Sequence, residues 1–401
     1  MTQSPVTRRS GLTLVEILIA MIMTLIVLFA MMEAFKYASG EMQRSRAVIE
    51  MSNQLRAAQE LLRSDLEHMT LDPRPWTQTA LPKGYFEYIE AVGRDSTNAV
   101  SATENYLGDV DDILAFTVNR PEQPFRGRYN GNIIESPMAE VIWWTHWDDR
   151  NSDNVIDFDE SVTLYRRVLL IRPDLNLSAH TADATFFSTN DVSARVDSSN
   201  SLVANRLEDL GHRGARVARN SNSSFPHLLN RNLLDSYKMA ANSRPTGDDV
   251  VLNNLAGFDV KVYSPTTAIQ EDNNLVLQPG DVGYASASNK AGAFVDLHHN
   301  CTGWFGAAAH VKSGLSGNTV TAYDTWTPVY EVDGVAQNGT TDQATNGLDD
   351  DGANGVDDTN ERDTMPPYPY AVRGLKVSLR LVEKNTKQVR QASVIHSFVP
   401  E

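Results

Sequence analysis

Length, composition and charge already limit what this chain can be. Its 401 residues are enough for one large domain or for two or three small ones. The net charge of −16, from 51 acidic and 35 basic side chains, would repel nucleic-acid phosphates, so we expect no nucleic-acid partner. The single cysteine, Cys301, excludes an intrachain disulfide and any zinc site built on paired cysteines.

An apolar segment follows a short polar N-terminus. Residues 1–11 include Arg8 and Arg9, and residues 12–32 are apolar except for two threonines and Glu16. At a rise of about 1.5 Å per residue, a helix over residues 12–32 would be roughly 31 Å long, which matches the hydrocarbon core of a bilayer. Because the arginines precede this helix, we expect its short end to face the cytoplasm and the rest of the chain to lie outside.

Glu16 is a carboxylate within this apolar segment. A charge there costs several kcal/mol unless it is paired, and neither a cleaved secretory signal nor a plain signal anchor explains it. If the chain is cleaved between Gly11 and Leu12, a new α-amino group appears one helical turn from Glu16. The amine of a neighbouring subunit then becomes a counter-charge. We therefore interpret residues 1–11 as a leader and Glu16 as an assembly residue.

The sequence from Arg8 to Ala20 resembles the class III signal of type IV prepilins and type II secretion pseudopilins. It combines a basic leader, a glycine before the cleavage point, an apolar run and a glutamate at the fifth mature position. Leu12 stands where the family usually has phenylalanine. The resemblance implies that prepilin peptidase cleaves after Gly11 and N-methylates Leu12 in a bacterial inner membrane.

A second helical pattern continues beyond the apolar segment. Apolar residues spaced by threes and fours form one stripe: Val48, Met51, Leu55, Ala58, Leu62, Leu66 and Met69. We expect this stripe to pack on a sheet. Pro73 and Pro75 should end the helix, so residues 33–72 are predicted as an amphipathic half that follows the membrane half.

Residues 73–401 are predicted to form one extracytoplasmic β domain. β-branched and aromatic runs predict strands at residues 113–118, 140–145, 162–169 and 257–263, and a C-terminal hairpin at 375–381 and 389–398. A long helix packed on an antiparallel sheet is an α+β fold. Residues of about 174–250 and 264–365 are rich in Asn, Ser, Asp and Gly, and we interpret them as long loops or insertions.

This order of elements is similar to the J-type minor pseudopilin of type II secretion and the W-type minor pilin. The resemblance implies a pilin-like structural subunit, at or near the tip of a periplasmic pseudopilus. Its partners would be other minor and major pseudopilins or pilins, prepilin peptidase and an inner-membrane assembly platform. Two alternatives stay open: a minor pilin of a surface pilus for adhesion, DNA uptake or motility, and a membrane-anchored binding protein or hydrolase. Because no common enzyme motif occurs in the sequence, we do not expect an enzyme.

Two acidic segments carry the oxygen ligands that calcium prefers. The first, residues 149–160, has side-chain ligands at positions 1, 3, 5, 9 and 12 of an EF-hand-type loop and a backbone ligand at position 7. These residues are Asp149, Asn151, Asp153, Asp157 and Glu160, with Val155 at the backbone position. Asp349, Asp351 and Asp357 fit positions 1, 3 and 9 of a less complete second loop. The resemblance favours calcium, since major pseudopilins use it to hold a C-terminal loop. A solvated acidic turn and a disordered linker are the alternatives for the two segments.

Overall fold

The structure is a computed structural model of the chain, and the description covers part of it. The described residues are 13–71, 83–91, 108–148, 150, 160–180, 184–197, 201–219, 229–236, 248–272, 275–279, 284, 290–297, 311–315, 318–325, 349, 352–353, 355–356 and 372–398. Every structural statement below refers to these residues.

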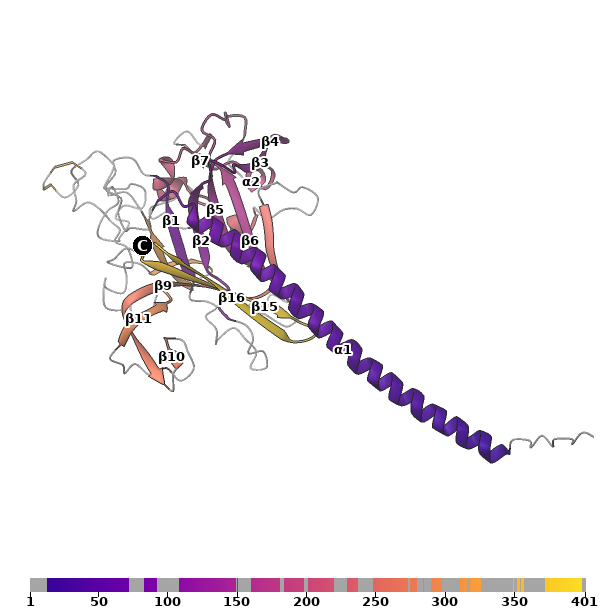
Figure 1. The fold of residues 1–401 in the computed structure, drawn as a ribbon. Coiled ribbons are helices and arrows are strands. Elements are labelled where there is room, and N and C mark those ends of the chain that lie inside the picture. The colour runs from indigo at the N-terminus through magenta and orange to yellow at the C-terminus, as the bar shows by residue number, and fades with distance from the viewer. Residues whose placement is uncertain are drawn as a thin grey trace, which may run out of the picture.

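One long helix and a large antiparallel sheet dominate the fold (Figure 1). Helix α1 spans Leu14–Glu67, and its N-terminal part projects away from the sheet. The sheet has 11 strands in the order β12-β13-β1-β2-β5-β6-β9-β15-β16, with β10 and β11 also paired to β9. The strands are β1 (Phe86–Ala91), β2 (Ile113–Asn119), β5 (Met138–Trp147), β6 (Val162–Leu170), β9 (Asp248–Asp272), β10 (Leu275–Leu277), β11 (Lys290–Val295), β12 (Val311–Leu315), β13 (Asn318–Asp324), β15 (Gly374–Glu383) and β16 (Gln388–Ser397). The predicted α+β class is confirmed.

The strands predicted from β-branched and aromatic runs are all present. The predictions at 113–118, 140–145 and 162–169 fall within β2, β5 and β6. The C-terminal hairpin forms as predicted, and β15 pairs with β16 along its whole length from Gly374 opposite Ser397 to Glu383 opposite Gln388. The prediction at 257–263 covers only the middle of β9, which runs for 25 residues because it pairs with β6, β15, β10 and β11 in turn.

Helix α1 ends at Glu67, before the predicted boundary at residue 72. The chain is already bound to the end of β2 when it leaves the helix. Met69 forms a β-bridge with Val118, and the backbone N–H of Thr70 donates to the carbonyl of Thr117 at 3.0 Å. Tertiary hydrogen bonds therefore terminate the helix before the prolines are reached.

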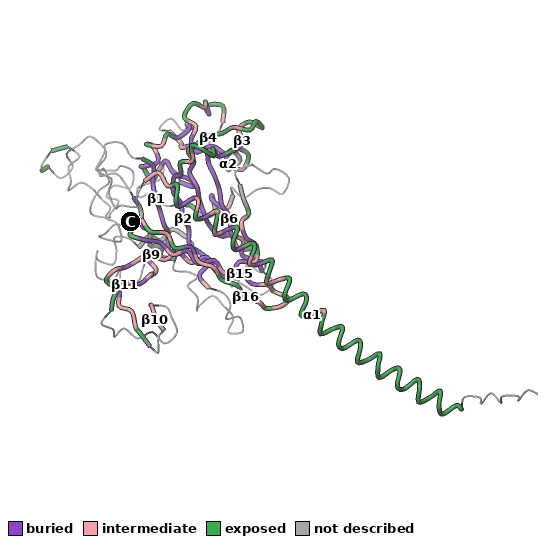
Figure 2. The backbone as a smooth tube through the Cα atoms, in the orientation of Figure 1, coloured by how far each residue is buried: buried purple, intermediate pink, exposed green. Residues whose placement is uncertain are grey.

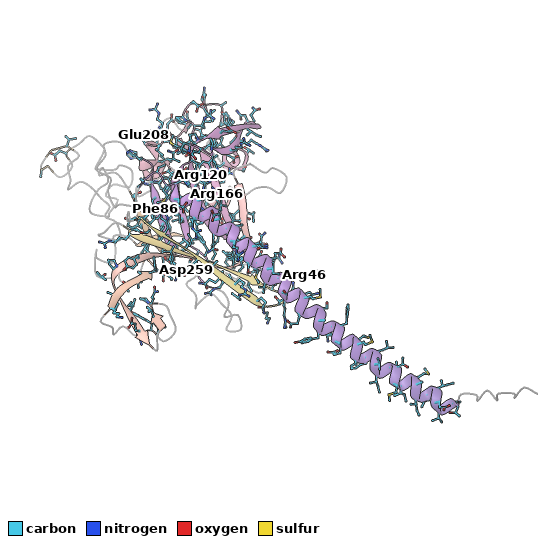
Figure 3. The ribbon with its side chains drawn as sticks, viewed as in Figure 1. Arg46, Phe86, Arg120, Arg166, Glu208 and Asp259 are labelled. Atoms are coloured by element: carbon cyan, nitrogen blue, oxygen red, sulfur yellow. The ribbon has the colours of Figure 1, made fainter. Side chains whose placement is uncertain are left out.

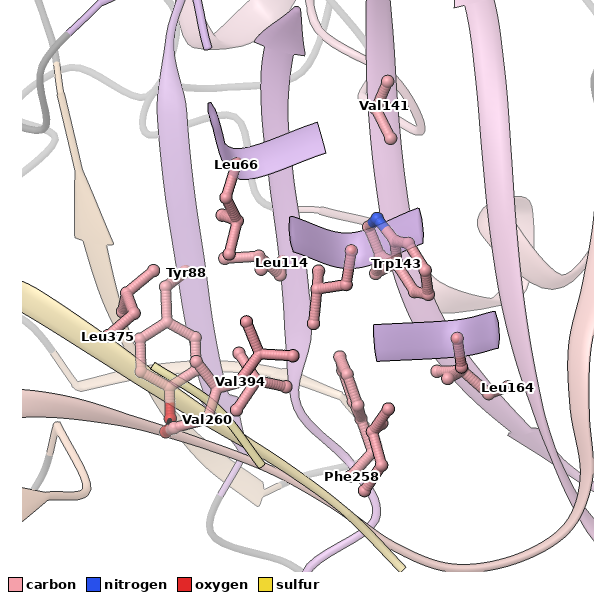
Figure 4. Packing of buried hydrophobic residues seen from close by; sticks show 14 of the residues in the cluster. Leu66, Tyr88, Leu114, Val141, Trp143, Leu164, Phe258, Val260, Leu375 and Val394 are labelled. Atoms are coloured by element: carbon pink, nitrogen blue, oxygen red, sulfur yellow. Dashed lines mark hydrogen bonds between the residues drawn. The ribbon is translucent and has the colours of Figure 1, made fainter. Parts of the chain in front are cut away.

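The main hydrophobic core lies between the C-terminal part of α1 and one face of the sheet. The buried apolar residues of the helix all belong to the predicted stripe: Met51, Leu55, Ala58, Leu62 and Leu66. Figure 4 shows Leu66 near Leu114 of β2 and Trp143 of β5, with Phe258 of β9 in the same cluster. This confirms that the stripe packs on a sheet.

The opposite face of the sheet is covered by part of the first predicted insertion. Residues 174–236 contribute α2 (Ala184–Thr189), the β7–β8 hairpin (Ala194–Val196, Leu202–Ala204) and α3 (Arg231–Ser236). Phe186 and Leu234 from this layer share a second core with Ile142 and Trp144 of β5. Because alternate residues of β5 point to opposite faces, Trp143 and Trp144 enter different cores. A second hairpin, β3–β4 (Phe125–Tyr129, Asn132–Ser136), lies close to α2 and β7 (Figure 1).

The segment expected to be loops at 264–365 also carries secondary structure. It contains the end of β9 together with β10, β11, β12 and β13. Strand β13 pairs with β1, so this segment extends the main sheet past its first strand. Composition alone pointed to loops here, whereas pairing with long neighbouring strands supplies the order.

Candidate functional site

The N-terminus of α1 is closed by a capping box. Thr13 is the N-cap, and its backbone N–H and hydroxyl both donate to one carboxylate oxygen of Glu16 at 2.9 Å. In return the backbone N–H of Glu16 donates to the Thr13 hydroxyl at 3.3 Å. Glu16 therefore has a local partner, which the spacing of threonine and glutamate could have indicated. Gly11 and Leu12 lie outside the described residues.

The first half of α1 is exposed along its length (Figure 2), and most of its residues are apolar. Leu14 is 81 % exposed, and Phe29 and Phe35 are also exposed. By length and composition, α1 can cross a membrane. Apolar area of this extent is unfavourable in water, so this surface is suited to an apolar environment.

The second half of α1 is fastened to the sheet by Asp65, which is fully buried. Both carboxylate oxygens of Asp65 accept from the guanidinium of Arg166 on β6, at 2.7 and 2.9 Å. Arg120 donates to the same carboxylate at 2.7 Å, and the indole N–H of Trp143 donates at 3.0 Å. Figure 3 shows Arg120 and Arg166 beside this end of the helix. The network fixes the position of α1 along the sheet.

Three carboxylates meet between β1 and β9, and none of them belongs to the two predicted calcium loops. Glu90 is the last residue but one of β1, and Asp109 and Asp112 precede β2. One carboxylate oxygen from each lies within 4.8 Å of the other two. Glu90 and Asp112 are fully buried and Asp109 is 8 % exposed. Oxygen atoms in this arrangement are the ligands that calcium and magnesium prefer.

Hydrogen bonds hold Asp112 against β9. Its Oδ2 accepts from the backbone N–H of Val260 at 2.6 Å and from the Tyr88 hydroxyl at 3.3 Å. The Tyr88 hydroxyl also contacts a carboxylate oxygen of Glu90 and the carbonyl of Val260. The other oxygen of Asp112, Oδ1, has no hydrogen-bond partner among the described residues, although the side chain is fully buried.

The electrostatics of this cluster disfavour three ionised carboxylates. Burial, and then the nearby charges of Asp109 and Glu90, raise the pKa of Asp112 well above its usual range. At an effective dielectric constant of about 20, two unit charges about 4.8 Å apart repel by roughly 3 kcal/mol. Lys261 on β9 forms ion pairs with Asp259 at 3.2 Å and Asp296 at 2.5 Å. Because Lys261 is engaged by Asp259 and Asp296, we expect a cation or bound protons to neutralise the negative charge of the three carboxylates.

The residues predicted to bind calcium are mostly outside the described part of the chain. Of the predicted ligands in the first loop only Glu160 is described, and of those in the second only Asp349, which is exposed. Those outside are Asp149, Asn151, Asp153, Val155, Asp157, Asp351 and Asp357. Glu160 is buried, and its two carboxylate oxygens accept from the indole N–H of Trp147 and the backbone N–H of Arg150, each at 2.8 Å. The carboxylate of Glu160 thus joins the two ends of the segment that holds the first loop.

Sequence patterns did not predict the Glu90–Asp109–Asp112 cluster. Glu90 and Asp109 are separated by the connection between two strands, and neither stands in a metal-binding spacing. The one feature that could have indicated the site is the group of acidic residues at 109–112 directly before a predicted strand.

Comparison of the chain with known proteins adds no assignment: no protein-family model, no curated protein and no solved structure matches it.

Proposed function

We propose that this chain is a minor pseudopilin, a structural subunit at or near the tip of a type II secretion pseudopilus. The observation that supports this most is the division of α1 into an exposed apolar half and a half packed on an antiparallel sheet. A subunit of this form can be held in a bilayer by its free half. After assembly it can bury the same apolar surface against the helices of neighbouring subunits.

The prepilin-like sequence supports the same proposal. In this proposal, prepilin peptidase removes residues 1–11 after Gly11 and methylates the new N-terminus at Leu12. The carboxylate of Glu16 then pairs with the amine of an adjacent subunit, because an unpaired charge at this depth is costly. Before assembly the chain is a single-pass protein of a bacterial inner membrane with its sheet domain in the periplasm. Other pseudopilins and the assembly platform are its partners.

The proposed role is mechanical rather than enzymatic. Asp65 joins the helix to the sheet through Arg166, Arg120 and Trp143, so a force on α1 passes directly into the β domain. Such a connection suits a subunit that is pulled from the membrane and pushed along a fibre. It does not create a group poised for catalysis, since each partner of Asp65 is bound and buried or partly buried.

Processing of the N-terminus is the first test. The full chain is expressed with active or inactive prepilin peptidase, extracted from membranes and weighed intact. We expect the wild type to lose residues 1–11 and gain one methyl group only with the active peptidase. Gly11→Leu should keep the leader, whereas the matched variant Ser10→Ala should be processed normally. Retention of residues 1–11 in the wild type with active peptidase would sink the proposal.

The kind of fibre is the second test. Deletion of the gene in its own bacterium should reduce the export of secreted proteins, and the wild-type gene should restore export. If export is normal and surface pili disappear instead, the chain is a pilin of a surface pilus, and the secretion proposal is wrong.

A further inference from the structure

We infer that Glu90, Asp109 and Asp112 bind one calcium ion, which fastens the start of β2 to β9. This site is separate from the two acidic loops at 149–160 and 349–357, and it does not depend on the proposed function. The inference rests on the spacing of the three carboxylates, on their burial and on one unpaired oxygen.

The spacing suits a single shared cation. Protein oxygens bind calcium at about 2.3–2.6 Å, so two ligands on opposite sides of one ion lie roughly 5 Å apart. The carboxylate oxygens of Glu90, Asp109 and Asp112 all lie within 4.8 Å of one another. One ion can therefore contact all three with small side-chain rotations.

The unpaired oxygen distinguishes Asp112 from two other fully buried carboxylates, those of Asp65 and Glu140. Asp65 has donors on both oxygens from Arg166, and Glu140 has Tyr85 and Val217 on one oxygen and Ser193 on the other. Those carboxylates are satisfied by the protein. Asp112 Oδ1 is fully buried without a donor among the described residues, and a buried carboxylate oxygen in that state is costly unless something outside the chain binds it.

The ligand chemistry favours calcium over other divalent cations. Carboxylate oxygens, with the Tyr88 hydroxyl and the Val260 carbonyl close by, form an all-oxygen surrounding that does not select zinc. Magnesium keeps several water molecules and requires near-octahedral geometry, which suits a buried site made of protein oxygens poorly. Calcium accepts more protein ligands and irregular geometry.

The location gives the ion a structural consequence. Strands β2 and β9 are not neighbours in the sheet, since β5 and β6 lie between them. Residues 108–112 nevertheless run along β9: Gly108 N donates to the Ala256 carbonyl at 2.6 Å, and Phe258 N donates to the Asp109 carbonyl at 2.7 Å. Figure 4 shows the ring of Tyr88 directed at Val260 in the same place. An ion here would hold two distant strands of the sheet together.

The experiment uses the full chain in detergent, dialysed against calcium or against EGTA. Bound calcium is measured by mass spectrometry of the metal, and Tm is measured by circular dichroism. We expect Asp112→Asn to bind one equivalent of calcium less than the wild type. At calcium about a hundredfold above Kd, the wild-type Tm should rise by roughly 4 °C over its value in EGTA. Asp349→Asn, an exposed acidic residue in the second loop, is the matched control and should leave this site unchanged.

Comparing Tm in EGTA with Tm in calcium distinguishes a calcium ligand from an aspartate that only accepts hydrogen bonds. In EGTA, Asp112→Asn should melt at or above the wild-type temperature, because the substitution removes repulsion among the carboxylates. In calcium it should melt below the wild type. Equal calcium content in the two proteins would overturn the inference. So would a variant that melts below the wild type by the same amount in both conditions, since Asp112 would then act only as an acceptor for Val260.

A second variant keeps the test decisive if Asp112→Asn does not fold. Glu90→Gln removes one charge from the cluster without touching the hydrogen bond that Asp112 accepts from β9. This variant should also bind one equivalent of calcium less than the wild type. Its Tm should be at or above that of the wild type in EGTA and below it in calcium. Unchanged calcium binding in Glu90→Gln would refute the site.

Discussion

The two halves of α1 belong to one continuous helix yet meet opposite surroundings (Figure 2). In the first half Leu25 is 63 % exposed, and in the second half Leu62 is fully buried. Both residues are leucines in regular α-helix. The difference lies in their neighbours along the chain, because the first half is apolar on all sides and the second has a single apolar stripe.

This contrast shows what the pattern of apolar residues decides. A stripe can be satisfied by one surface, and here the sheet supplies it. A helix that is apolar all round has to be surrounded, and among the described residues the sheet covers only the second half of α1. By length and composition the first half can cross a membrane, and the second half packs against the sheet of its own chain.

The largest effect should come from breaking the polar contact that anchors the second half. Asp65→Ala removes the partner of Arg166, Arg120 and the Trp143 indole, and leaves a buried guanidinium without its counter-charge. We expect a loss of about 3–5 kcal/mol in the free energy of unfolding, measured by denaturant titration of the full chain in detergent. Membrane insertion should be unchanged.

Glu60→Ala is the matched control for Asp65→Ala. Glu60 lies on the same half of α1, but its side chain is 77 % exposed. Its removal should leave the unfolding midpoint where it is. An equal loss in the two variants would mean that the network around Asp65 does not hold the helix.

A pair of leucine substitutions compares the two halves directly. Leu62→Ala should lower the free energy of unfolding by about 3 kcal/mol, because it leaves a cavity between helix and sheet. Leu25→Ala makes the same chemical change in the exposed half and should not alter the unfolding of the β domain. If Leu25→Ala destabilises the β domain as much as Leu62→Ala, the two halves are not independent.

The first half should be sensitive to charge rather than to volume. Under the proposed function, Glu16→Ala should still insert and be cleaved, but it should join a fibre poorly. A lost pairing of only about 1.4 kcal/mol would already lower association tenfold. Crosslinking of neighbouring subunits in cells measures the change.

Glu16→Gln separates the charge from the helix cap. Glutamine at this position can still accept from Thr13, as in other capping boxes, but it carries no charge. We expect it to assemble as poorly as Glu16→Ala. If Glu16→Gln assembles like the wild type, the role of Glu16 is to cap the helix, and the intersubunit pairing is wrong.

Regular elements with a clear period could be predicted from the sequence. The stripe from Met51 to Leu66 and the alternation in residues 375–381 both reflect burial on a single face, and both elements form as predicted. Strand β1 was missed because Glu87 and Glu90 interrupt its apolar pattern. Glu87 is buried there because Arg216 and Arg219, far along the chain, neutralise it.

The candidate metal site could not be predicted for the same physical reason. Glu90, Asp109 and Asp112 come together only when β1 and β2 pair and residues 108–112 align with β9. In residues 149–160 all the predicted calcium ligands fall within twelve positions, so their spacing can be recognised in the sequence. The ligands of a site assembled by tertiary pairing are far apart in the sequence, so no short motif reveals them. Each acidic residue by itself resembles one in an exposed turn.

The smallest expected effect concerns the acid sensitivity of the contact between the second half of α1 and β16. His396 on β16 is partly buried beside α1, and its ring packs against Phe398 with centroids 4.8 Å apart. Burial lowers the pKa of His396 below its usual value of 6.5, and the nearby charge of Glu67 opposes that shift only in part. The folded protein therefore holds this proton less tightly than the unfolded chain does. The contribution of the neutral ring to stability is complete above about pH 6.5 and is lost as the pH falls through the lowered pKa of the folded state.

His396→Gln removes this titration while keeping a polar side chain of similar reach. Between about pH 7 and pH 5 the variant should lose less stability than the wild type, as measured by Tm at each pH. Comparison with the wild type cancels the carboxylates that titrate in the same range, because they are present in both proteins. Parallel curves for the two proteins would show that the contact between α1 and β16 does not sense pH. If the variant loses more stability in acid than the wild type, the charged ring of His396 is stabilised beside Glu67, and the predicted lowering of its pKa is wrong.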